Sequence, residues 1–179
     1  PQDFSLWIAA DGPGINEMHK LYENDQRISW LGRITETDKL DRLSRCTVFC
    51  APSLRGESFG IVLLEAMAAA VPLVTTDIDG YRNVATHELD ALLVAPGDEE
   101  QLATSIIRIV NDPTLSKRLV AGGLKRAEDF SMQRLATEYV AIYERLLAAE
   151  KNSEITVQPN RLLSMFEHRV LRRSPSSHK

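Results

Sequence analysis

The sequence has little cysteine, no long hydrophobic run and only a small net charge, and each of these deficits excludes a class of protein. Two cysteines, Cys46 and Cys50, are too few for a disulfide framework or a zinc site. No run of about 18 apolar residues is present to cross a membrane. A formal net charge of −4 gives no basic footprint for nucleic acid. We expect both cysteines to act as small hydrophobes in a buried strand and its approach.

The sequence does contain enough apolar material for an ordinary folded domain. Its 179 residues are 44% hydrophobic and 26% charged, which is typical of a soluble globular protein. Short apolar runs of strand length alternate with segments of helical period. The alternation predicts an α/β fold, a Rossmann-like parallel sheet flanked by helices. We predict strands at 4–11, 27–34, 47–53, 71–77 and 90–96, and helices at 15–24, at 37–46 and over roughly a dozen residues around Glu65.

From Asp98 onward the pattern is helical. The first helix begins with acidic residues, which suits the helix dipole. Pro113 starts a second helix that runs to about Asp129, with a soft spot or break predicted at Gly122 and Gly123. A third helix is predicted over 131–152, with Ser131 as its N-cap.

The chain divides into one domain and a tail. Residues 1–152 carry the α/β and helical patterns, and residues 153–179 are basic and rich in serine and proline. We predict a disordered tail for this second segment, with a short amphipathic helix resting on an anionic membrane surface as the alternative. The chain has no initiator methionine and enters a strand almost at once, so we expect it to be a piece of a longer protein.

Two glutamates mark the candidate site. Glu57 precedes an apolar run and Glu65 lies inside it, with seven residues between them. The predicted strand 47–53 ends just before this segment, at the edge where parallel sheets bind ligands. We predict a helix start near Ser58, where the main-chain N–H groups of residues 58–61 form an anion site. Gly56 and Gly60 are expected to let a ligand approach closely.

The two carboxylates are expected to face different parts of one ligand. Glu57 would repel a phosphate, so a sugar hydroxyl is its suitable partner. Glu65 would lie about 12 Å further along a helix, within reach of a ribose. The structural alternative makes Glu57 an ordinary helix-start acid and Glu65 a solvated one. Glu65 is harder to explain in that way, because a buried carboxylate needs a partner.

These residues belong to a longer ordered pattern. The segment 52–84, "PSLRGESFGIVLLEAMAAAVPLVTTDIDGYRNV", resembles the glutamate–seven–glutamate signature of retaining glycosyltransferases with the GT-B fold. The family's other motifs follow in order, and the resemblance covers about residues 4–147. Within the family, segment 50–74 is most similar to actinobacterial phosphatidylinositol mannosyltransferases. The further motifs read "IAADGPG", "ISWLGRI", "LLVAPGD" and "RAEDFSMQRLATEYVAIYERL".

The resemblance implies a role for each matching residue. Glu57, the catalytic candidate, would hold hydroxyls of the donor sugar, and Glu65 would bind the nucleotide ribose. Ser58 is a donor-binding candidate from the helix-start argument above, through its main-chain N–H group. The remaining donor-binding candidates are Phe59, Gly60 and Ile61 for backbone contacts, Ile34 against the base, Glu36 and Lys39 at its edge, and Gly12 near the nucleotide cleft. An acid and a lysine at the base edge suit guanine.

The implied protein is the C-terminal, donor-binding half of a GT-B hexosyltransferase. The favoured reaction moves mannose from GDP-mannose to phosphatidylinositol, in the cytoplasm and peripherally on the inner face of the membrane. No metal or other cofactor is expected, because this fold stabilises the leaving diphosphate with positive side chains and helix dipoles. The family's acceptor-binding domain and its diphosphate-binding Arg and Lys lie upstream of Phe4. We therefore predict that this chain alone does not turn over.

Departures and alternatives remain. Ala70 replaces the family's usual glycine, and residues 77–84 depart from its Gly-Gly-x-x-Glu form. The alternative functions are a non-catalytic nucleotide-sugar-binding module, a hexosyltransferase with a UDP-sugar donor and, more distantly, a sugar-nucleotide epimerase. Segment 77–79, "DID", imitates a metal motif of another glycosyltransferase fold, but we do not expect it to bind metal; 11–14, "DGPG", lacks the G-x-G-x-x-G spacing of a dinucleotide loop, so no NAD site is expected. We expect His19 and His87 to be surface residues.

Overall fold

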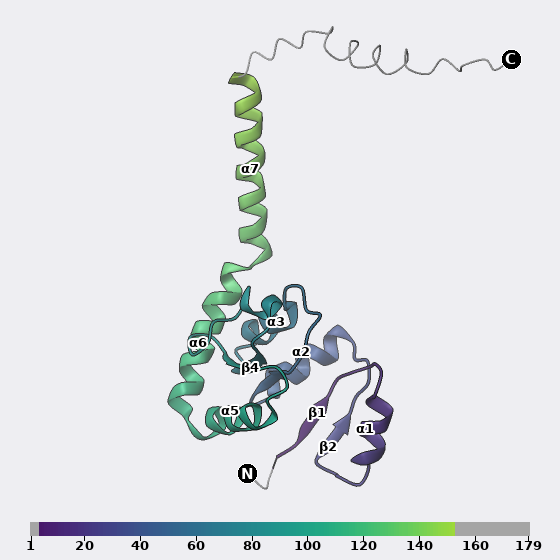
Figure 1. Ribbon diagram of the computed structural model, residues 1–179. Helices are drawn as coiled ribbons and strands as arrows, with labels where there is room; N and C mark the ends of the chain where they lie inside the picture. The colour runs from purple at the N-terminus through teal and green to yellow at the C-terminus, as the bar shows by residue number, and fades with distance from the viewer. Residues whose placement is uncertain (1–3, 153–179) are drawn as a thin grey trace, which may run out of the picture. The chain divides into compact units, whose positions relative to one another are not determined.

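A computed structural model describes residues 4–152 of the chain (Figure 1). The chain forms two compact units, Pro1–Arg134 and Leu135–Lys179. The first unit carries all five described strands and six of the helices. The predicted tail, 153–179, lies outside the described residues.

All strands of the first unit are parallel, as predicted. β1 (Leu6–Ile8) pairs with β2 (Ile28–Trp30), and a second sheet has the order β3-β4-β5. The described strand pairs thus form a two-stranded sheet and a three-stranded sheet, with β4 between β3 and β5 in the second. The α/β class is therefore confirmed, with the described hydrogen bonds divided between two sheets. The strands of the second sheet are β3 (Phe49–Ala51), β4 (Leu73–Thr76) and β5 (Leu92–Val94).

Helices connect the strands and then follow them. Six of the seven were predicted with small differences at their ends, and the short helix α4 between β4 and β5 was not predicted. The bounds are α1 Ile15–Leu21, α2 Glu36–Arg45, α3 Ile61–Ala68, α4 Asp79–Arg82, α5 Glu99–Asn111, α6 Pro113–Asp129 and α7 Met132–Asn152.

The core lies on both faces of β4. Leu73 belongs to a buried cluster with Leu63 and Met67 of α3, and the next residue, Val74, belongs to a second cluster with Ile109 and Leu119. Successive side chains of a strand point to opposite faces, so the single strand β4 organises both clusters. The two clusters cover opposite faces of β4, the strand that pairs with β3.

The helix predicted from Pro113 to about Asp129 is confirmed, and the break offered at Gly122 and Gly123 is wrong. α6 continues through both of them. A Cβ at Gly122 would lie 2.1 Å from the carbonyl oxygen of Leu89, and one at Gly123 would lie 3.1 Å from Cγ of Met67. Both glycines therefore allow close packing of α6, and helix propensity alone gave the wrong interpretation.

The cysteines lie as expected. Both are free and partly buried, with Cys50 in β3. Burial raises the pKa of the Cys50 thiol to about 11. The side chains therefore act as small apolar groups that stay protonated near neutral pH.

The second unit contains most of α7. Its start is capped as predicted, because the Ser131 hydroxyl accepts a hydrogen bond from the Arg134 amide at 3.3 Å. Tyr139, Ile142 and Leu146, which share one face at helical spacing, are 53%, 42% and 61% exposed. Within the described part of the chain, no helix combines the length and apolar character that a membrane span requires.

Candidate functional site

The segment between β3 and α3 forms a hollow of about 330 Å³ at the carboxyl end of the sheet. Seven consecutive residues line it, and they include the whole predicted phosphate-binding turn. Two of its residues are glycines, which leave main chain exposed to the hollow at those positions. The lining residues are Gly56, Glu57, Ser58, Phe59, Gly60, Ile61 and Val62.

The helix after this hollow begins at Ile61 rather than near Ser58, which corrects the prediction. Gly60 is its N-cap and has a left-handed backbone with φ of +83°, a conformation that ends the helix on that side. The 12 Å separation predicted for Glu57 and Glu65 assumed a continuous helix and does not apply. The interpretation of Glu57 as a helix-start acid is also wrong, because the first turn of α3 contains no acidic residue.

The start of α3 presents main-chain N–H groups without side-chain competition. No side chain caps the helix, and the Leu63 amide donates to the Gly60 carbonyl at 3.0 Å. The amides of Ile61 and Val62 precede any partner within the helix. Both residues line the hollow, so this end of α3 is a suitable place for an anion.

Glu57 is exposed beside that helix end. Among residues 4–152, no basic side chain forms an ion pair with its carboxylate. A carboxylate in this state is a strong acceptor for ligand hydroxyl groups. Its main chain packs closely against Gly80, where a Cβ would lie 2.1 Å from the Glu57 carbonyl oxygen.

The structure gives Gly60 a use beyond the predicted one, which stays a prediction. Gly60 is buried, and a Cβ there would lie 2.7 Å from Cδ1 of Tyr81. Its absent side chain therefore admits the tyrosine ring, in addition to permitting the left-handed backbone. Gly56, with φ of +89° and open space around its Cα, remains free to approach a ligand.

Phe59 anchors the hollow at its other side. Its ring meets the ring of Phe130 edge to face, with centroids 5.4 Å apart. The guanidinium of Arg126 lies 4.8 Å from the Phe130 centroid and donates hydrogen bonds to the carbonyls of Val84 and Asn83. The end of α6 thus supports the turn that carries Glu57.

Glu65 has the partner that its surroundings required. The Lys39 ammonium donates to Glu65 at 2.7 Å and to Glu36 at 3.0 Å. The two carboxylates raise the pKa of Lys39, with Glu36 the larger cause. Lys39 and Glu65 are 23% and 27% exposed, so both remain accessible to a ligand. The structure therefore joins the three residues predicted for the ribose and the base edge; their ligand roles stay predictions.

Gly12 and Ile34 lie outside these two groups. Gly12 lines a second hollow of about 290 Å³ between β1 and α1, beside Asp11. Arg33 donates to Asp11 at 2.6 Å, which links the loop after β2 to this hollow. Ile34 is partly buried in the loop before α2. No described contact joins Gly12 or Ile34 to Glu57 or Glu65.

The two aspartates of the "DID" segment are held by one arginine. Arg82 donates to Asp77 at 2.6 Å and to Asp79 at 2.8 Å. The Arg82 hydrogen bond lowers the pKa of Asp77. Within residues 4–152, no group of three or more metal-ligating side chains comes together. The arginine gives this segment a structural use.

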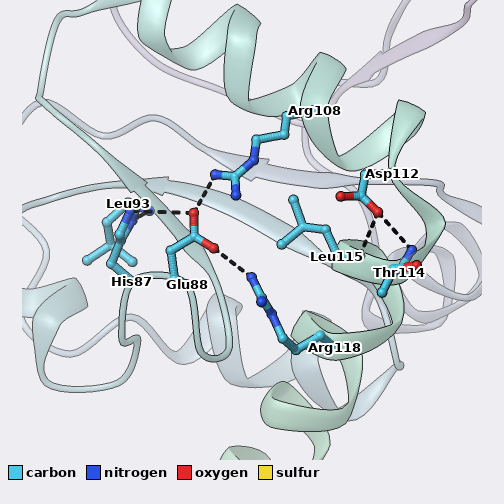
Figure 2. A network of polar contacts seen from close by, with 8 residues as sticks. All are labelled: His87, Glu88, Leu93, Arg108, Asp112, Thr114, Leu115 and Arg118. Atoms are coloured by element: carbon cyan, nitrogen blue, oxygen red, sulfur yellow. Dashed lines mark hydrogen bonds and ion pairs between the residues drawn. The ribbon is translucent and has the colours of Figure 1, made fainter.

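A separate charged network joins Glu88, in the loop before β5, to α5 and α6. Figure 2 shows the Glu88 carboxylate between the guanidinium groups of Arg108 and Arg118. Arg108 is the main cause of the lowered pKa of Glu88.

His87 is exposed, as predicted, and its Nδ1 accepts a hydrogen bond from the Leu93 amide at 2.9 Å. His19 is exposed too, with its ring centroid 5.2 Å from that of Trp30.

Sequence reasoning missed the residues that support the turn. Tyr81 shares a 2.9 Å hydrogen bond with the Ser53 hydroxyl, and Thr76 donates to the Ser53 carbonyl at 2.6 Å. Gly80 and Tyr81 come from α4, which the pattern did not predict. The available signal was the glycine inside segment 77–84, since such a residue often marks a close approach of two main chains.

Comparison with known proteins gives a family match and several relatives. Residues 2–126 match the family described as Glycosyl transferases group 1. A phosphatidyl-myo-inositol mannosyltransferase of Mycobacterium leprae (strain TN) is 33% identical over 132 residues, which cover 74% of this chain and 35% of that protein. The chain therefore spans about a third of the length of that relative.

Solved structures show the same architecture. Sucrose-phosphate synthase from Thermosynechococcus elongatus has a TM-score of 0.68 at 28% identity and covers 80% of this chain and 38% of its own. HepE of Anabaena, solved in complex with UDP-glucose, has a TM-score of 0.72 at 20% identity, over 81% of this chain and 42% of its own. The second likeness concerns the fold alone.

Proposed function

Because this chain belongs to the group 1 glycosyl transferases, we propose that it is the donor-binding half of a retaining hexosyltransferase. Its fold is that of GT-B glycosyltransferases, as the sequence predicted. One observation carries the proposal: the Glu57 carboxylate, which has no basic partner among residues 4–152, and the uncapped start of α3 line the same hollow at the carboxyl edge of the sheet.

The chemistry of the hollow suits a sugar diphosphate. In this proposal the amides of Ile61 and Val62, which no side chain caps, bind phosphate oxygens, and the dipole of α3 favours negative charge there. The Glu57 carboxylate accepts hydrogen bonds from hydroxyl groups of the sugar in this proposal. Hydrogen bonds of this charged type are stronger than neutral ones, so they orient the sugar as well as hold it.

The Lys39 cluster suits the nucleoside. Glu65 is an acceptor for ribose hydroxyls, while Lys39 supplies a donor and Glu36 an acceptor for the edge of a base. A guanine presents both kinds of group, so this combination favours a GDP-sugar. Gly12 and Ile34 would bound the nucleotide from the β1–β2 side.

The favoured donor is GDP-mannose and the favoured acceptor is phosphatidylinositol. Support comes from the identity of 33% to a phosphatidyl-myo-inositol mannosyltransferase. The chain covers about a third of that protein, so we propose that a further domain supplies the acceptor site and the basic diphosphate ligands. We propose that binding needs no metal, and that the complete protein acts at the cytoplasmic face of a membrane.

Calorimetric titration tests the donor. GDP, GDP-mannose, UDP and UDP-glucose are titrated into the chain in EDTA and again in magnesium. We expect selective binding of guanine nucleotides, unaffected by magnesium and lost in Glu65→Ala. The control is Glu100→Ala, which removes an exposed acid from the first turn of α5 and should leave binding unchanged.

Two results would redirect the proposal. Preference for uridine nucleotides would retain the transferase and change its donor, as in the UDP-glucose complex of HepE. Binding of a nucleotide sugar without turnover, even after an acceptor domain is supplied, would favour a non-catalytic binding module. Absence of binding to all four compounds would contradict donor binding by this chain.

A further inference from the structure

We propose that Gly80 and Tyr81 of α4 are positioning residues for Glu57, and that they determine how well the site holds the sugar part of its donor. The inference rests on the proposed function of Glu57. Neither residue is among those that line the hollow, and we infer that both act through the turn at 53–60.

Gly80 forms the closest support of Glu57. A Cβ at position 80 would lie 2.1 Å from the Glu57 carbonyl oxygen, 2.6 Å from its carbonyl carbon and 3.2 Å from its Cβ. The first two neighbours are main-chain atoms, which cannot move aside as a side chain can. Any larger residue at position 80 must therefore displace the main chain of Glu57 or that of α4.

Tyr81 holds the turn at two further points. Its ring packs where a Gly60 side chain would stand, and its hydroxyl shares a 2.9 Å hydrogen bond with Ser53. The side chain is 1% exposed, so it has little freedom. Burial raises the pKa of Tyr81, and the negative charge of Glu57 adds to the rise, which is consistent with a neutral hydroxyl near that carboxylate.

Helix α4 is itself fixed, so it can act as a support. Arg82 donates to the side chain of Asp77, to its carbonyl oxygen at 2.9 Å and to Asp79. The amides of Tyr81 and Arg82 both donate to the Ile78 carbonyl at 3.0 Å. A four-residue helix tied at its start and at its end presents Gly80 and Tyr81 in one arrangement.

This support acts on the sugar more than on the nucleotide. Glu57 packs closely against Gly80. The nucleoside candidates Glu65 and Lys39 come from α3 and α2, and they make no described contact with Gly80 or Tyr81. A displacement of Glu57 should therefore weaken the contribution of the sugar to affinity and leave that of the nucleoside diphosphate unchanged.

The test compares two glycine variants with the same clash distance. Gly80→Ala and Gly122→Ala each bring a Cβ to 2.1 Å from a main-chain carbonyl oxygen, but only Gly80 contacts Glu57. Affinities for GDP-mannose and GDP, or for UDP-glucose and UDP if those bind instead, are measured by calorimetry. We expect Gly80→Ala to reduce the preference for the sugar nucleotide about tenfold, since small misplacements have large effects. Gly122→Ala should keep that preference.

A double variant separates positioning from general damage. If Gly80 acts through Glu57, then Gly80→Ala should add no further loss of preference to that of Glu57→Gln. Tyr81→Phe, which keeps the ring and removes the bond to Ser53, should cause a smaller loss of the same kind. Equal losses in Gly80→Ala and Gly122→Ala, or additive losses in the double variant, would overturn the proposal.

Amide hydrogen exchange keeps this test independent of the proposed function. If the wild-type chain binds none of the four compounds, donor binding fails, and the positioning role is judged from exchange at 56–60. We then expect faster exchange there in Gly80→Ala than in wild type or in Gly122→Ala. Unchanged exchange at 56–60 in Gly80→Ala would overturn the positioning role on its own.

Discussion

The start of α3 and the starts of α5 and α6 are built in opposite ways. Asp98 caps α5 by accepting a hydrogen bond from the Gln101 amide at 2.8 Å, and Asp112 caps α6 by accepting from the amides of Thr114 and Leu115. α3 begins at Gly60 with no side-chain cap. Capping satisfies main-chain donors that otherwise need another partner. The capped N-termini of α5 and α6 have side-chain acceptors for their first main-chain N–H groups. The N-terminus of α3 has no side-chain acceptor, so its first N–H groups can donate to a ligand.

The acidic residues of the two regions differ in the same direction. Glu88 lies between two arginines that come from α5 and α6, and its charge is fully used within the protein (Figure 2). Glu57 forms no ion pair with the described residues of the chain. The Glu88 carboxylate is therefore paired within the protein, whereas the Glu57 carboxylate forms no ion pair within residues 4–152, as our proposal for sugar binding requires.

The largest effect is expected from the core beneath the capped helices. Leu119 is 1% exposed in the cluster around Val74 and Ile109, so Leu119→Ala should lower the free energy of unfolding by about 3 kcal/mol. Urea denaturation measures the change. At a temperature where the variant is folded, affinity for the donor should be unaltered. A selective loss of sugar binding would show that the two regions are not separate.

Glu57→Gln should give the reverse result. It removes a charged acceptor from an exposed position, so we expect about a tenfold loss of nucleotide-sugar affinity, or roughly 1.4 kcal/mol. Stability should change little, because no ion pair within the described residues depends on the carboxylate. Paired calorimetry and urea denaturation check both quantities. A variant that loses stability and retains affinity would assign Glu57 to the scaffold.

Removing a cap should affect stability alone. Asp112→Ala leaves the amides of Thr114 and Leu115 without their acceptor, and we expect a loss of about 1 kcal/mol in the free energy of unfolding. The control is Asp112→Asn, which retains an acceptor oxygen and should recover most of the loss. Equal destabilisation by both substitutions would mean that the charge, rather than the cap, matters.

The smallest effect is expected at Glu88 and depends on pH. Its folded pKa is lowered, so the ion pairs contribute stability above the unfolded value near 4.5, and this contribution is lost as pH falls through the lower folded value. Glu88→Gln should cost about 0.5–1 kcal/mol at pH 7, since the pairs are partly screened. The difference from wild type should shrink below pH 4.5. A constant difference across that range would exclude the ion pairs as its cause.

The sequence was informative where a residue's neighbours in the chain decide its structure. Ser131 at a helix start and the alternation of strands with helices are local signals, and both predictions are confirmed. The close grouping of Glu36, Lys39 and Glu65 depended on a family pattern, since α2 and α3 are joined only in three dimensions.

The sequence failed where long-range packing decides. The low helix propensity of glycine suggested a break at Gly122. The close contact with Leu89 that explains this glycine is not apparent from the sequence. α3 starts at Ile61 rather than near Ser58 as predicted. Its N-cap, Gly60, makes room for Tyr81, which lies 21 positions later in the sequence. Helix α4 is four residues long, which is too short to give a periodic signal, and it was missed together with its support of Glu57.

The most direct measurement is the response of the backbone amides to GDP, followed by NMR. We expect the amides of Ile61 and Val62 to shift most, and to saturate together, as the diphosphate occupies the uncapped start of α3. The capped amides of Gln101 and of Thr114 should not move. Shifts confined to the capped ends, or absent from Ile61 and Val62 while GDP binds, would contradict the assignment of this helix end as the diphosphate site.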